Sequence, residues 1–176
     1  MRIRTLVAAD APWYRQLMLE AYRTAADAFT STAEERSLEP ISWWVARIAH
    51  PQGLSVAFGA EEEDRLVGAV ALEYSARPKI QHTALLIGMV VREPARGQGV
   101  GRALLAAAID HAAQRPGVQI ILLTVTEGNT AAIHLYQQAG FQVWGIQPLA
   151  IATPAGYKRK VHMAYRLPDP VQAAMA

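Results

Sequence analysis

The alternation of apolar and polar positions along the chain predicts strands and helices in turn. Short runs rich in aliphatic and β-branched residues favour strands, whereas apolar residues that recur three or four positions apart favour helices. The expected strands span residues 2–7, 54–58, 66–74, 82–91, 119–126, 141–146 and 161–167. The expected helices span residues 10–23, 32–50 with an interruption at Pro40, 99–115 and 129–139. The pattern therefore predicts a mixed α/β fold.

Turn and cap residues support these boundaries. Asp10 and Pro12 are typical of the first turn of a helix, and Pro116 ends the alanine-rich helix. The acidic segment 61–64 predicts an antiparallel hairpin with a solvated tip. Because the alanine-rich helix follows one strand and precedes another, it predicts a crossover between parallel strands. The sheet should thus contain both parallel and antiparallel pairs.

A glycine-rich loop follows the strand 82–91 and leads into a helix. The strand breaks at Pro94, and Gly97, Gly99 and Gly101 then leave several backbone N–H groups free of bulky side chains. The positive end of the following helix points at the same place. The segment therefore predicts a pyrophosphate site.

Residues that are absent from this loop exclude two classes of phosphate ligand. The lysine and the hydroxyl residue that a nucleoside triphosphate loop requires are absent. Arg102 stands where a dinucleotide fingerprint requires its third glycine, and Glu127, the nearest acidic residue at the expected ribose distance, lies beyond the next strand. Neither a nucleoside triphosphate nor a dinucleotide is expected.

Composition excludes several other classes of protein. The chain has 176 residues without a cysteine, which excludes disulfides and a thiolate nucleophile, and its five scattered histidines give no metal-ligand spacing. The formal net charge is +2, and the basic run 158–160 is interpreted as a solvated strand end, so no nucleic acid is expected. No apolar run approaches about 18 residues, and residues 1–5 alternate like a strand, so neither a membrane span nor a signal peptide is expected. We expect a single domain over residues 1–176, located in the cytoplasm.

Two ordered motifs carry a resemblance to a known family. The first is Arg96-x-x-Gly99-x-Gly101 after a valine-rich strand. The second runs from Asn129 to Phe141 as Asn-x-x-Ala-x-x-Leu-Tyr-x-x-x-Gly-Phe. Together they resemble motifs of the GCN5-related N-acetyltransferase (GNAT) superfamily, most specifically over residues 87–141. The resemblance implies a twisted mixed sheet of about seven strands flanked by about four helices.

The resemblance also implies an activity. A member of this family transfers an acetyl group from acetyl-CoA, used as a co-substrate without a metal, directly to a primary amine of a small molecule or a protein. Two other readings stay open. One is a non-catalytic module that binds acetyl-CoA as a sensor or partner, and the other is an acyltransferase that uses another acyl-CoA.

Family members bind the cofactor through the loop and the strand before it. In this family the strand binds the pantetheine arm through its backbone, here at Met89, Val90 and Val91. The resemblance assigns the pyrophosphate to Arg96, Gly97, Gln98, Gly99, Val100, Gly101 and Arg102. Gly88 interrupts an otherwise apolar strand and predicts a bulge that splays the sheet to admit the thioester.

Tyr136 matches the family tyrosine whose hydroxyl protonates the coenzyme A thiolate. A phenol can donate to a thiolate of comparable basicity. Tyr136 shares a helical face with Asn129 and Ala132, which are expected to contact the pantetheine. The general base stays open. Glu73 and His82, on or beside the central strands, are the candidate side chains, and a water relay is the alternative.

Aromatic residues are the candidates for the acceptor site. Phe29, Trp43 and Tyr157 are suited to build a wall beside an apolar or cationic amine. Trp43 and Trp44 are adjacent and cannot share a helical face, so one of them is expected in the core. The expected partner is a small-molecule or peptide amine, without nucleic acid or membrane. A homodimer through the C-terminal strands is a further expectation.

Overall fold

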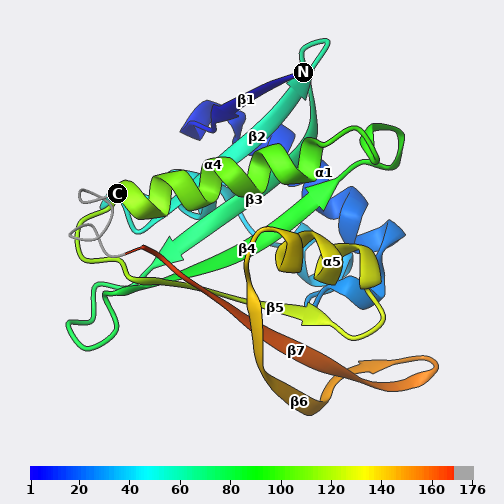
Figure 1. The fold of residues 1–176 in the computed structure, drawn as a ribbon. Helices are drawn as coiled ribbons and strands as arrows, with labels where there is room; N and C mark the ends of the chain where they lie inside the picture. Colours follow the sequence, from blue (N-terminus) through cyan, green and yellow to red (C-terminus); the bar gives the residue numbers. More distant parts are fainter. Residues whose placement is uncertain (169–176) are drawn as a thin grey trace.

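A twisted seven-stranded sheet forms the centre of the computed structural model, which describes residues 1–168 (Figure 1). The strand order is β1-β2-β3-β4-β5-β7-β6. The strands are β1 (Arg2–Thr5), β2 (Ser55–Glu62), β3 (Arg65–Tyr74), β4 (Thr83–Val91), β5 (Ile120–Thr126), β6 (Gln142–Thr153) and β7 (Gly156–Arg166). Only β4 and β5 are parallel neighbours, so the described sheet is mixed, as predicted.

The described residues form five α-helices and three short 3-10 turns. The helices are α1 (Ala11–Thr24), α2 (Ala33–Ser37), α3 (Ile41–Ile48), α4 (Val100–Gln114) and α5 (Thr130–Gln138). The turns are η1 (Ala8–Asp10), η2 (Ala26–Ala28) and η3 (Glu93–Ala95). The expected helix 32–50 is two helices, because Pro40 takes an extended conformation between α2 and α3.

The two faces of β3 carry side chains of different size. Val70 and Leu72 belong to the apolar cluster that includes α4 and α5. Ala69 and Ala71 belong to the cluster on the other face, which contains Trp44 and the buried residues of α1. Small side chains on that face let the N-terminal helices pack close to the strand. Figure 1 shows α4 in front of the sheet and the N-terminal helices behind it.

The C-terminal hairpin is longer than the residue pattern predicts. The pattern predicts strands over 141–146 and 161–167, whereas β6 and β7 cover most of residues 142–166. The pairing of β6 with β7 shifts register between Gln147 and Ile151, so a bulge accommodates Pro148 within the strand.

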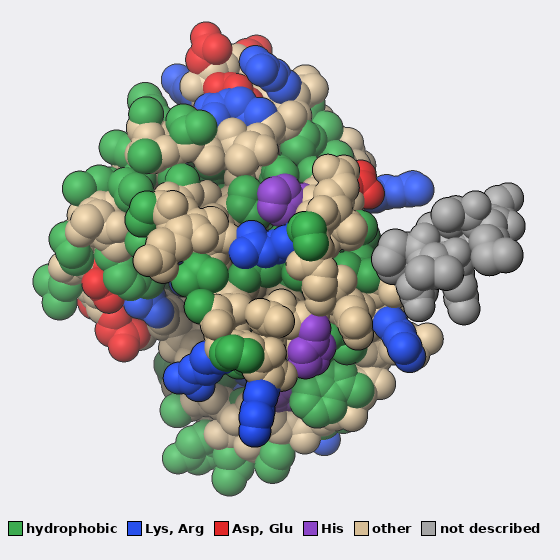
Figure 2. All heavy atoms as spheres, turned by 90° about the vertical axis from the view of Figure 1, so that its left-hand side faces the viewer, with side chains coloured by type: hydrophobic (Ala, Val, Ile, Leu, Met, Phe, Trp, Pro, Cys, Tyr) green, Lys and Arg blue, Asp and Glu red, His purple; other side chains and the backbone are tan. Residues whose placement is uncertain are grey.

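The outer strand β6 is open to solvent. It exposes Val143, Trp144 and Ile146, and no described strand pairs with its outer edge. Figure 2 shows exposed hydrophobic side chains at the lower end of the molecule, where Figure 1 places β6. The homodimer expected through the C-terminal strands stays a prediction.

The parallel strands β4 and β5 separate after a short stretch of pairing. They pair over Thr83–Leu85 and Ile120–Leu122. Beyond Leu85, β4 continues to Val91 without β5 beside it. The sheet therefore opens at the C-terminal ends of these two strands.

A bulge in β4 lies within the separated part. Ala69 of β3 pairs with Val90, and Ala71 pairs with Ile87, so two residues of β4 oppose one residue of β3. One of the two is Gly88, which has a φ of +61°. The bulge predicted at Gly88 is confirmed.

Candidate functional site

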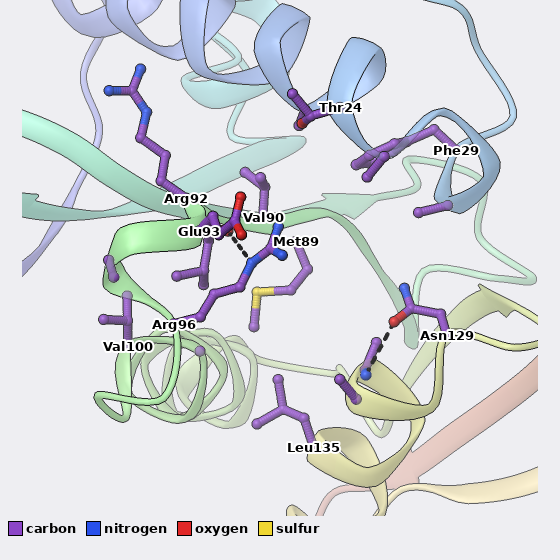
Figure 3. Close-up of a pocket in the computed structure, with 18 of the residues that line it drawn as sticks. Thr24, Phe29, Met89, Val90, Arg92, Glu93, Arg96, Val100, Asn129 and Leu135 are labelled. Carbon is purple, nitrogen blue, oxygen red and sulfur yellow. Dashed lines mark hydrogen bonds between the residues drawn. The ribbon is translucent and has the colours of Figure 1, made fainter.

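A cavity of about 1040 Å³ lies where β4 and β5 diverge (Figure 3). Its walls come from the ends of both strands, the loop after β4, the first turns of α4 and α5, the C-terminal half of α1, and η2. Lys158 of β7 completes the lining. The cavity therefore connects the glycine loop with the N-terminal helices.

The loop between β4 and α4 surrounds open space. Gly97 and Gly99 have φ values of +76° and +79°, and apart from the adjacent residues of the chain nothing lies within 4 Å of where a Cβ atom would stand at either position. The positive φ explains the choice of glycine, and Gly99 is the N-cap of α4. Arg96 Nε donates a hydrogen bond to the Val91 carbonyl at 3.0 Å, and Arg96 and Arg102 both line the cavity. A helix N-terminus beside two cations suits a pyrophosphate.

Gln98 is a residue of the predicted loop site that the structure does not bring to the cavity. Its Nε2 atom donates to the Pro94 carbonyl at 2.9 Å and so closes the turn. The other predicted residues of this segment line the cavity, namely Arg96, Gly97, Gly99, Val100, Gly101 and Arg102. Gly101 also lets two helices approach, because a Cβ there would lie 3.2 Å from Leu135 of α5.

The second wall of the cavity is a free edge of β4. Met89, Val90 and Val91 line the cavity, and no described strand pairs with this part of β4 on its β5 side. The backbone of such an edge can bind an extended amide chain as a neighbouring strand would. The adjacent bulge packs against α1, because a Cβ at Gly88 would lie 2.9 Å from the Tyr14 hydroxyl.

Helix α5 places its first two turns at the cavity (Figure 3). Asn129 and Ala132 line it, and Asn129 Oδ1 accepts a hydrogen bond from the Ala132 N–H at 3.3 Å as the N-cap of the helix. Tyr136 does not line the cavity, whereas Leu135 does. Tyr136 is 5% exposed, and its ring centroid lies 5.8 Å from that of Phe141. Burial raises the pKa of the Tyr136 hydroxyl well above its usual range, so the group stays protonated at neutral pH.

Glu73 and His82 lie away from the cavity. Glu73 accepts a hydrogen bond from Arg47 at 3.2 Å and pairs in register with Leu85, before β4 and β5 separate. His82 is exposed and precedes β4, at the end opposite Val91. At a rise of roughly 3.3 Å per residue, His82 lies about 20–30 Å along β4 from the lining residues 89–91. Since neither side chain lines the cavity, the structure does not support the expectation that one of them is the general base.

One of the three aromatic acceptor candidates reaches the cavity. Phe29 lines it and packs edge-on against Tyr22, with ring centroids 4.8 Å apart. Trp43 lies elsewhere, beneath the guanidinium of Arg36 at 4.6 Å, and Tyr157 is 69% exposed at the start of β7. The structure therefore does not bring Trp43 and Tyr157 to the cavity beside Phe29. Trp44 is the buried member of the tryptophan pair.

One face of α1 supplies lining residues that the sequence pattern does not single out. Leu17, Glu20 and Thr24 recur at helical spacing and line the cavity. Glu20 pairs with Arg92 at 2.8 Å and so connects α1 with the end of β4. The spacing predicts that this face of α1 is covered, but it cannot separate a helix over a core from a helix over a cavity.

The basic run at the start of β7 is partly exposed, and it also makes specific contacts that the sequence did not predict. Lys158 pairs with Asp27 of η2 at 2.5 Å, and Lys160 donates a hydrogen bond to the Thr30 hydroxyl. Arg159 pairs with a carboxylate at the end of β5. The run therefore ties β7 to the segment after α1, beside the cavity.

Two further features of the described residues bear on function. Residues 1–168 contain no group of three or more histidine, aspartate or glutamate side chains placed to hold a metal ion. None of the helices described over the same range has the length and apolar character that crossing a membrane requires.

Comparison with known proteins places the chain in a family. The model of the acetyltransferase (GNAT) family matches residues 18–141. A mycothiol acetyltransferase from Renibacterium salmoninarum is 34% identical over 116 residues, which is 65% of this chain and 32% of that protein. The chain thus spans about a third of the length of this curated relative.

Solved structures share the fold. A GCN5-related N-acetyltransferase from Kribbella flavida matches with a TM-score of 0.78 and 31% identity, over 94% of this chain and 97% of that one. A putative acetyltransferase from Salmonella typhimurium, solved with its cofactor acetyl-CoA, matches with a TM-score of 0.79 and 23% identity, over 96% and 95% of the two chains. Since the family model covers more than half of the chain, including β4, the glycine loop and α5, the chain belongs to the acetyltransferase (GNAT) family.

Proposed function

We propose that the protein transfers an acetyl group from acetyl-CoA to a primary amine of a small molecule or a protein. The observation that carries this proposal is one continuous cavity that joins a glycine loop at the N-terminus of α4 to the free edge of β4. A pyrophosphate and an extended pantetheine chain are complementary to these two parts. The mycothiol acetyltransferase relative and the neighbour solved with acetyl-CoA support the same class of reaction.

The open space at the loop fits the phosphates of this co-substrate. Side chains at Gly97 and Gly99 would fill that space, and Arg96 and Arg102 supply positive charge beside it. The backbone of β4 at Met89, Val90 and Val91 would hold the pantetheine arm. Bound acetyl-CoA supplies a thioester whose acetyl group is activated for attack by an amine.

The transfer forms a C–N bond and breaks a C–S bond. The amine loses one proton and the departing thiolate gains one, so protons balance. Backbone N–H groups of β4 beside the bulge are suited to stabilise the negative charge that develops on the carbonyl oxygen. Of the candidates named from the sequence, Glu73 and His82 do not line the cavity, so the proposal takes the water relay as the general base.

Tyr136 is the proposed proton donor to the thiolate. Its hydroxyl is held in the protonated form by burial, and Ala132, one helical turn earlier, lines the cavity. Hydrogen bonds at active sites often tighten only in the complex with substrate, so a buried tyrosine beside the cavity is consistent with the role.

A non-catalytic acetyl-CoA-binding module is the second candidate. It is favoured by the burial of Tyr136 and by the distance of Glu73 and His82 from the cavity. Release of free coenzyme A thiol, measured with acetyl-CoA and a panel of primary amines, separates the two candidates. Thiol release that depends on an amine would rule out the non-catalytic module. Binding of acetyl-CoA without thiol release for any amine overturns the enzyme. Repeating the assay with propionyl-CoA tests the choice of acyl group.

A further inference from the structure

One face of β7 is directed at the segment after α1, beside the cavity. Lys158 and Lys160 are two positions apart, so their side chains lie on the same face of the strand. Both reach the segment after α1, where they contact Asp27 and Thr30. Since Lys158 and Asp27 line the cavity, these two side chains form its wall on the side away from α4.

A buried hydroxyl lies beside Lys160. Thr126 of β5 pairs in register with Lys160 of the antiparallel strand β7, so the two side chains lie on one face, with Cβ atoms about 5 Å apart. Thr126 lines the cavity and is 2% exposed. Its Oγ1 atom has no hydrogen-bond partner in the described structure. Such a buried polar atom in a cavity wall is expected to have a partner when the cavity is filled.

Lys160 is a cation without a carboxylate partner among the described residues. Its neighbours Lys158 and Arg159 each form an ion pair, whereas Lys160 donates only to the neutral hydroxyl of Thr30. Burial lowers the pKa of the Lys160 ammonium, because desolvation disfavours the charged form. A bound anion would offset that desolvation.

Three of the four acidic residues that line the cavity are ion-paired, and the fourth, Glu93, lies in η3 beside the glycine loop. Glu20 pairs with Arg92, Asp27 pairs with Lys158, and the carboxylate at the end of β5 pairs with Arg159. Each of these carboxylates therefore has its charge offset. Thr126 lines the cavity with an unpaired hydroxyl, and Lys160, which does not itself line the cavity, stands next to Thr126 without a carboxylate partner among the described residues.

We propose that the acceptor is an amine that also carries a carboxylate, and that the Lys160 ammonium and the Thr126 hydroxyl bind this carboxylate. The inference rests on the proposed acetyl transfer and names the class of its acceptor. Phe29, which lines the cavity, would face the carbon skeleton between the two functional groups.

The experiment compares amino acids with their matched carboxamides as acceptors. Thiol release from acetyl-CoA is followed for the wild type and for Lys160→Met, which keeps length but removes charge. Thr126→Val removes the hydroxyl at similar volume, and Lys160→Arg restores the charge. Lys79→Met, at an exposed position in the loop before β4, controls for the loss of one positive charge.

We expect the wild type to prefer the carboxylate form by tenfold or more in kcat/KM. Lys160→Met should lose most of that preference through a higher KM, with the acetyl-CoA Kd unchanged. Thr126→Val should lose part of it, while Lys160→Arg and Lys79→Met keep it. A wild-type preference for carboxamides, or an unchanged preference in Lys160→Met, would overturn this inference and leave acetyl transfer intact. If none of the amino acids or carboxamides gives thiol release, both this inference and the proposed acetyl transfer are overturned.

Discussion

Tyr136 is the single residue on which the proposed chemistry depends most. We expect Tyr136→Phe to lower kcat by about a hundredfold, within the range of a lost proton donor. The acetyl-CoA Kd should stay unchanged, because the ring keeps its contact with Phe141. Because burial raises the pKa of the hydroxyl, the donor stays protonated as the pH rises toward 10, and wild-type activity should not fall there for lack of this proton. Equal kcat for variant and wild type across the alkaline range would remove Tyr136 from the mechanism.

Gly88 is a residue whose replacement should disturb the β4 bulge. An alanine at this position would be strained by the φ of +61°. Its Cβ atom would also lie only 2.9 Å from the Tyr14 hydroxyl. We expect Gly88→Ala to lower the free energy of unfolding by about 2 kcal/mol in urea titrations. Tyr14→Phe alone should cost little, since the Tyr14 hydroxyl is buried without a partner in the described structure. Gly88→Ala should then cost less in the Tyr14→Phe background. An equal cost in both backgrounds would contradict the assigned contact.

The assignment of the base to water is also a statement about single residues. We expect Glu73→Gln and His82→Ala to leave the pH dependence of kcat/KM unchanged, because neither side chain lines the cavity. Glu73→Gln weakens the contact with Arg47, so its effect should appear in thermal stability instead. Loss of the acidic limb of the pH profile in either variant would restore that residue as the general base.

At the scale of elements, the hairpin between β2 and β3 carries strain at its tip. Glu63 and Asp64 have φ values of +49° and +59°, a conformation that favours Asn-Gly in two-residue turns. We expect Glu63→Asn combined with Asp64→Gly to stabilise the protein by about 1 kcal/mol and to raise Tm by roughly 2–4 °C. Calorimetry measures the change, and Glu62→Gln at the same exposed tip is the control. An equal rise in the control would assign the gain to reduced charge repulsion.

Local signals predict most elements but not the C-terminal hairpin. α1 begins after Asp10, and β4 ends before the glycine loop, because caps and turns are properties of adjacent residues. The strands of the hairpin follow a different rule. Side chains of β6 are exposed along most of the strand, so no apolar face repeats at every second position. β6 is stabilised by its hydrogen bonds to β7. The pattern of residues along one strand does not reveal such pairing with another strand.

At the scale of the whole molecule, the site combines contiguous and distant parts of the chain. The glycine loop and the start of α5 could be predicted, because their backbone geometry depends on neighbouring glycines and caps. The wall opposite them could not. Lys158 meets Asp27 across 131 positions of sequence, and only the completed sheet brings η2 beside β7. Tertiary packing likewise puts Trp43 and Tyr157 outside the cavity, although their residue type suits an acceptor wall.

The central claim is that the cavity binds acetyl-CoA through the loop at Gly99. The most direct measurement is isothermal titration of acetyl-CoA into the wild type, Gly99→Asp and Gly99→Asn. Aspartate is favoured at a helix N-terminus and tolerates positive φ, so Gly99→Asp should fold while its charge repels the pyrophosphate. Gly99→Asn is the neutral control of the same size. We predict micromolar binding by the wild type, a loss of roughly a hundredfold in Gly99→Asp and a smaller loss in Gly99→Asn. No binding by the wild type, or equal binding by Gly99→Asp, would contradict the account.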